Sequence, residues 1–169
     1  MDIVWEELSA GLPDMRQLIH VVIRLFAAAI LGAIIGIQRE RAGKPAGLRT
    51  HILVMLGTTV FVVGCSLSGM DSDGLSRVIQ GIVTGIGFIG AGSILKISDK
   101  RDIIGLTTAA GVWMTAAIGV AVGLGVLGLA ILGTALTLLI FKLSDPLDLQ
   151  EDKDSLAAKE KTIEKTGEQ

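Results

Sequence analysis

The chain has 169 residues, of which 50% are hydrophobic and only 4% aromatic, and its mean hydropathy is +0.65. One core of this size cannot cover so much apolar surface, which excludes an ordinary water-soluble domain and indicates that lipid covers much of the chain. The formal net charge of −2 says little as a total, because the charges gather in short clusters between apolar runs. The single cysteine, Cys65, excludes an internal disulfide.

The N-terminal part predicts an extracytoplasmic segment, residues 1–17, followed by a first membrane span from about Leu18 to Ile37. The segment is acidic, and two interpretations of it are open, a short interfacial helix or a frayed tail. Arg24 lies inside the first span, where a charge is costly. It either extends toward the membrane surface or pairs with an outer acidic residue, Asp71 or Asp73.

A dense polar segment, residues 38–51, follows the first span and contains four bases, one acid and one histidine, among them Arg39, Glu40, Arg49 and His51. Basic loops between spans favour the cytoplasmic side and anionic headgroups. The glycines and proline in this segment predict a defined turn. We expect Glu40 to pair with Arg49 across that turn, whereas His51 alone does not make a metal site.

Two further spans are predicted at about Ile52–Gly69 and Val78–Leu95. Between them lies a short loop with Asp71, Asp73 and Arg77, and Gln80 follows one turn into the next span. Carboxylates on the outer face are suitable ligands for Mg²⁺. The interpretation that we favour is that Asp73 caps the N-terminus of the third span.

Residues 103–141 carry no charge and are too long for one crossing, which predicts a hairpin of two helices that turns near Gly119–Gly125. The expected fold is therefore an all-α membrane protein, a bundle of five transmembrane helices over residues 18–143. The distribution of Lys and Arg predicts an N-terminus outside and a cytoplasmic C-terminus. Residues 144–169 then form a charged cytoplasmic tail.

Glycine is abundant, and residues 85–90 read G-x-G-x-x-G, the letters of a dinucleotide-binding fingerprint. Their flanks are apolar, so close packing of membrane helices is the better interpretation than a phosphate-binding turn. The predicted packing faces combine Gly32 and Gly36 on the first span with two faces on the third: Gly81, Gly85 and Gly92 on one, Gly87 and Gly90 on the other. The alternative is unwound backbone that lines an ion path.

Several ordered blocks resemble the MgtC/SapB family of bacterial inner-membrane proteins. They are Arg24-Leu25, residues 31–41 (LGAIIGIQRER), Gly43-Lys44 with residues 46–51, Arg77 with Gln80, residues 85–92 (GIGFIGAG), and residues 105–110 with Trp113 and residues 116–119. The resemblance covers about residues 20–143. Gln38 stands where the family pattern leads us to expect Glu, and the chain is similar to the shorter members, without the C-terminal ACT-like domain of the virulence-associated ones.

The resemblance implies a multi-pass protein of the inner membrane, linked to growth at low magnesium and to control of membrane potential. We expect it to be non-enzymatic, without a cofactor or nucleic-acid partner, and to act through helix contacts with itself or with another membrane protein. The alternative is a small homo-oligomeric channel or transporter for Mg²⁺ or a monovalent cation. The candidate functional residues are polar: Arg24, Arg39, Glu40, Arg49, His51, Asp73, Arg77 and Gln80.

Overall fold

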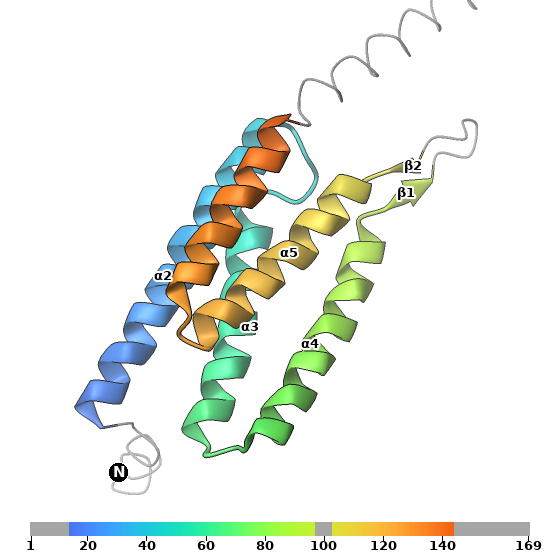
Figure 1. Ribbon diagram of the computed structural model, residues 1–169. Helices are drawn as coiled ribbons and strands as arrows, with labels where there is room; N and C mark the ends of the chain where they lie inside the picture. The colour runs from blue at the N-terminus through green and yellow to red at the C-terminus, as the bar shows by residue number, and fades with distance from the viewer. Residues whose placement is uncertain (1–13, 97–102, 144–169) are drawn as a thin grey trace, which may run out of the picture.

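The structure is a computed structural model that describes residues 14–96 and 103–143 (Figure 1). The predictions for the N-terminal segment before residue 14 and for the charged tail lie outside the described residues. The part of the chain that is described is helical almost throughout, as expected.

The described residues form five helices, which run up and down beside one another (Figure 1). They are α2 (Met15–Arg41), α3 (Leu48–Leu67), α4 (Ser72–Gly92), α5 (Leu106–Gly123) and a final helix, Leu127–Leu143, here called the C-terminal helix. The first four are long and apolar enough to cross a membrane. The fold is therefore that of a multi-pass membrane protein.

The predicted hairpin in the uncharged stretch is present, since α5 ends at Gly123 and the C-terminal helix begins at Leu127. Gly125 turns the chain there with a φ of +82°, a conformation that glycine adopts without steric cost. A two-residue ladder was not predicted: β1 (Leu95–Lys96) pairs antiparallel with β2 (Ile103–Ile104) at the end of α4.

The polar segment at residues 38–51 is mostly helical rather than a loop, which corrects the predicted boundaries. Residues 38–41 form the last turn of α2, and residues 48–51 form the first turn of α3, so the connection is only 42–47. Basic side chains in the last turn of α2, Arg39 and Arg41, complement the negative end of the helix dipole. Polar residues can therefore extend a membrane helix beyond its apolar part.

Helix α5 is the most buried of the four long helices and lies against α2, α3 and α4, whereas α4 lies at the edge of the bundle (Figure 1). The main core joins α2, α3, α5 and the C-terminal helix through Ala28, Ile35, Met55, Ile118, Ala121, Val122, Ala130 and Phe141. A smaller cluster of Ala46, Ile86, Val112 and Ala116 joins α4 to α5.

Candidate functional site

Arg39 is the largest fully buried side chain, with 1% of its surface exposed. It follows Gly32 and Gly36 at helical spacing, so the same side of α2 that approaches α3 turns Arg39 inward. Its guanidinium carbon lies 4.2 Å from the centre of the Phe141 ring. This cation–π contact links the end of α2 to the end of the C-terminal helix.

His51 is also 1% exposed, and its Nδ1 lies 2.7 Å from Oγ1 of Thr115 on α5. The Thr115 hydroxyl donates its only hydrogen to the carbonyl of Gly111, at 2.8 Å. With that hydrogen on Gly111, the Thr115 oxygen accepts from His51 in the tautomer that carries the proton at Nδ1, which is the tautomer that we assign. The histidine is thus a donor that joins α3 to α5 in the interior of the bundle.

Glu40 reaches across the connection between α2 and α3, but it does not form the predicted ion pair with Arg49. One carboxylate oxygen, Oε2, accepts a hydrogen bond of 2.9 Å from the backbone N–H of Leu48. Leu48 is the first residue of α3, where N–H groups lack helical partners and negative charge is favourable. Glu40 therefore caps α3 from α2, while Arg49 is exposed.

At the opposite end of the bundle, Arg24 bonds to a backbone carbonyl and does not form the predicted pair with Asp71 or Asp73. Its Nη1 donates a 2.8 Å hydrogen bond to the carbonyl of Gly123, the last residue of α5. A cation there satisfies a carbonyl that has no helical partner and complements the dipole of α5. A Cβ on Gly125 would stand 2.6 Å from Nη2 of Arg24, so the glycine also makes room for the guanidinium.

The cap of α4 is Asp71, which corrects the prediction that it is Asp73. The Asp71 carboxylate accepts from the backbone N–H of Gly74 at 2.8 Å. Asp73 stands in the first turn of the helix, exposed, as are Arg77 and Gln80. No group of three or more potential metal-binding side chains occurs among the described residues.

The predicted packing glycines fall into two groups. Cβ atoms on Gly32 and Gly36 would stand 3.0 Å or less from backbone atoms of α3, and one on Gly90 would stand 3.7 Å from Ala109 of α5. Cβ atoms on the other four, Gly81, Gly85, Gly87 and Gly92, would meet nothing within 4 Å. The first group brings helices of this chain together, whereas the second leaves α4 open.

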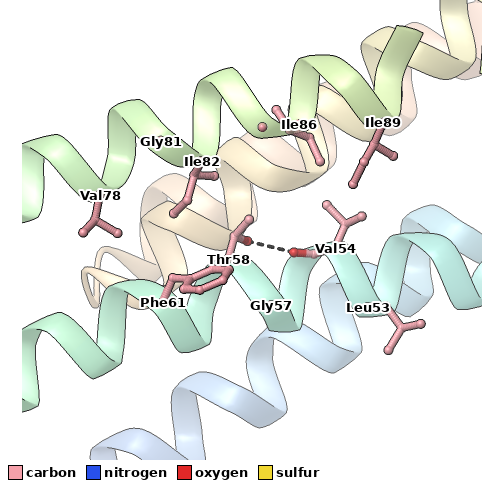
Figure 2. A pocket seen from close by; sticks show the side chains of 11 residues that line it. Leu53, Val54, Gly57, Thr58, Phe61, Val78, Gly81, Ile82, Ile86 and Ile89 are labelled. Atoms are coloured by element: carbon pink, nitrogen blue, oxygen red, sulfur yellow. Dashed lines mark hydrogen bonds between the residues drawn. The ribbon is translucent and has the colours of Figure 1, made fainter. Parts of the chain in front are cut away.

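An apolar pocket of about 700 Å³ lies between α3 and α4. Gly57 and Phe61 on α3 face Gly81 and Ile82 on α4 across it (Figure 2). Its one polar side chain, Thr58, donates within its own helix to the carbonyls of Val54 and Met55. The pocket therefore offers shape and apolar surface, without a free polar group to orient a polar ligand.

The profile of the MgtC family matches residues 25–149, which is most of the chain and includes all five helices in whole or in part. The chain belongs to the MgtC family. The protein SrpB of Synechococcus elongatus is 44% identical over 127 residues, which cover 69% of this chain and 70% of SrpB. No solved structure matches the chain.

Two longer relatives belong to the same set. The putative magnesium transporter YhiD of Escherichia coli K12 is 44% identical over 128 residues, covering 72% of this chain and 59% of YhiD. The protein MgtC of Brucella abortus is 41% identical over 132 residues, covering 78% of this chain and 54% of that protein. The MgtC-family chain described here thus spans little more than half the length of these two.

The predicted polar residues form no single site in this MgtC-family protein. Arg39, Glu40, Arg49 and His51 lie at one end of the bundle, and Arg24, Asp73, Arg77 and Gln80 lie at or toward the other (Figure 1). Sequence reasoning did not identify Thr115 and Phe141 as partners of His51 and Arg39. Two features of the sequence could have indicated these partners. Thr115 is a hydroxyl-bearing residue within a run of small residues, and Phe141 is an isolated aromatic residue at the end of a span.

Proposed function

We propose that this MgtC-family protein is a non-enzymatic, five-span protein of the bacterial inner membrane. Its role is in magnesium limitation and membrane-energy homeostasis, and it acts through helix contacts with itself or another membrane protein. Family membership supports the link to magnesium, since one relative carries the name of a putative magnesium transporter.

The fifth crossing in this proposal is the C-terminal helix. A helix of 17 residues is about 26 Å long, within the range that a bilayer core requires. With the N-terminus outside, as we propose, five crossings put the connection 42–47, the β1–β2 ladder and the end of the C-terminal helix on the cytoplasmic side. The basic residues near that face, such as Arg41, Lys44 and Arg49, support this orientation.

The observation that carries the proposal is how the two ends of the bundle use their polar groups. Arg24, Glu40 and His51 each bond to another helix of the same chain. These groups hold the bundle together, and the surface left for function consists of helix faces. The most open of these belongs to α4, the least buried of the four long helices.

Affinity capture from membranes tests the proposal. A tagged chain is expressed in a bacterium that lacks its own MgtC-family gene and grown at low magnesium, and contacts are cross-linked before detergent is added. We expect growth to be restored and a specific second copy or membrane protein to be recovered. Recovery of the monomer alone, or restored growth without any recovered contact, contradicts the proposal.

The second candidate is a small homo-oligomeric channel or transporter, favoured by the exposed Asp73, Arg77 and Gln80 on α4. With Arg24, these residues stand at the outer end, and Glu40 and Arg49 stand at the inner end. The buried charge among the described residues, however, is a cation, Arg39, which opposes cation passage through a single copy. Purified protein in sealed vesicles that moves no Mg²⁺, Na⁺, K⁺ or H⁺ excludes this candidate.

A further inference from the structure

Helix α4 carries two seams on opposite sides, each with residues spaced three and four apart. The inward seam is apolar and consists of the half-buried Leu75, Ile79 and Ile82 and the buried Ile86 and Gly90. Within it, Ile86 and Ile82 join the cluster with α5, and Gly90 lies against Ala109. This seam attaches α4 to its own bundle.

The exposed seam repeats alternately every four and three residues over the whole helix. Its members are Asp73, Arg77, Gln80, Thr84, Gly87 and Ala91, all exposed in the single chain. Spacing of four and three is the pattern by which two helices pack side by side along their length. The 19 residues from Asp73 to Ala91 span about 27 Å, the thickness of a bilayer core.

The composition of this seam is unsuited to lipid. Its outer half carries two charged residues, the Gln80 amide and the Thr84 hydroxyl, and its inner half consists of the small residues Gly87 and Ala91. Thr84 donates to the carbonyl of Gln80 within the helix, but within the described part of the chain the Gln80 amide has no hydrogen-bond partner. Exposed amides in membrane helices are typical of contacts between helices, and small residues allow the backbones to approach.

We infer that the exposed seam of α4 packs against the same seam of a second copy, around a two-fold axis along the membrane normal. Copies inserted in one orientation present parallel α4 helices, so equal residues meet. Gln80 has both donors and an acceptor and can pair with Gln80 of the second copy. Asp73 of each copy can pair with Arg77 of the other, so the charges at the outer end balance.

This inference rests on the proposed function, because it names the partner and the surface for the helix contacts. It also accounts for two of the four open glycines. Gly87 lies in the seam, and Gly81 lies beside it, so neither needs a neighbour within its own chain. Phe88, 85% exposed, flanks the seam and would cover its edge.

Disulfide cross-linking of the full chain in native membranes tests the seam. The native Cys65 is replaced by serine, and Thr84→Cys is compared with Val83→Cys, which is 46% exposed at the same depth but on another side of α4. Adjacent helical residues point about 100° apart, so we expect at least about fivefold more disulfide dimer for Thr84→Cys. Equal yields at both positions, or no dimer at either, overturn the inference.

A charge exchange gives the second measurement, read as the dimer fraction by energy transfer between two labelled copies. Asp73→Arg and Arg77→Asp alone place like charges together, and each should lower the dimer fraction about tenfold, whereas the double variant restores it. If the dimer fraction of the double variant does not recover, and Thr84→Cys also gives no disulfide dimer, the inferred contact between the two seams is contradicted. If a different membrane protein is then captured through α4 and growth at low magnesium is kept, the proposed function stands without the dimer. If no membrane protein is captured and growth is lost, the proposed function is contradicted as well.

Discussion

Nδ1 of His51 and Oγ1 of Thr115 lie 2.7 Å apart, and this hydrogen bond joins α3 to α5 through two fully buried side chains. The Thr115 hydroxyl donates its hydrogen to the carbonyl of Gly111, so the hydrogen bond between His51 and Thr115 depends on the proton at Nδ1. The pair is 64 residues apart in sequence. It is therefore a product of the packing of α3 on α5.

Thr115→Val removes the acceptor of that bond and keeps the shape of the side chain. The Nδ1 proton is then buried without its partner, so we predict a loss of about 1–3 kcal/mol in stability. Thermal unfolding in detergent, followed by size-exclusion chromatography, measures it. Thr107→Val on the same helix is the control, because within the described residues the Thr107 hydroxyl makes no hydrogen bond; a loss equal to that of Thr115→Val contradicts the prediction.

Gly36→Ala should lower the stability of the fold, whereas Gly81→Ala should not. A Cβ on Gly36 would stand 2.6 Å from the Cα of Leu48, and backbone cannot move aside without separating α2 from α3. We predict a loss of about 1–3 kcal/mol for Gly36→Ala. The same change at Gly81 meets nothing within 4 Å, and the better helix propensity of alanine should leave the fold unchanged or up to about 1 kcal/mol more stable.

Unfolding curves of the two glycine variants, measured in one detergent, decide the comparison. Similar losses at both positions would show that the approach of α2 to α3 does not depend on Gly36. The dimer fraction is recorded beside the unfolding curve, since Gly81 lies beside the exposed seam and its effect on association is separate from its effect on the fold.

Arg24→Met should weaken the outer end of the bundle. The change removes the donor to the carbonyl of Gly123 while keeping most of the side-chain length, and we predict a loss of about 1–2 kcal/mol for this partly exposed bond. Asp73→Asn is the control, because Arg24 bonds to the backbone rather than to Asp73. If Asp73→Asn loses as much stability as Arg24→Met, and the two losses are coupled, then Arg24 pairs with Asp73 as the sequence suggested, and this prediction is wrong.

Glu40→Ala should cost about 1 kcal/mol, the value of a helix cap. Arg49→Gln should be neutral, and a double-mutant cycle between the two should give a coupling within about 0.5 kcal/mol of zero. The reason is that Glu40 bonds to the backbone N–H of Leu48. A coupling well above that value would show that the carboxylate pairs with Arg49 in the membrane.

The helices could be predicted from the sequence because their apolar runs are long and the charges fall between them. The turn near Gly125 could also be predicted, because an uncharged run as long as residues 103–141 exceeds one membrane crossing and must turn back within it. The cap of α4 could not be chosen from sequence, because Asp71 and Asp73 suit the position equally and only the helix start distinguishes them. The partners of Arg24 and Glu40 are backbone groups, which carry no residue-type signal.

Growth at low magnesium measures whether the protein works through helix contacts in the membrane, as we propose. Gly87→Leu blocks the exposed seam of α4, whereas Val83→Leu places the same side chain at a neighbouring exposed position outside the seam. At equal amounts in the membrane, we predict that Val83→Leu restores growth of a strain lacking its own family member and that Gly87→Leu does not. Growth of Gly87→Leu at the wild-type rate would contradict the claim.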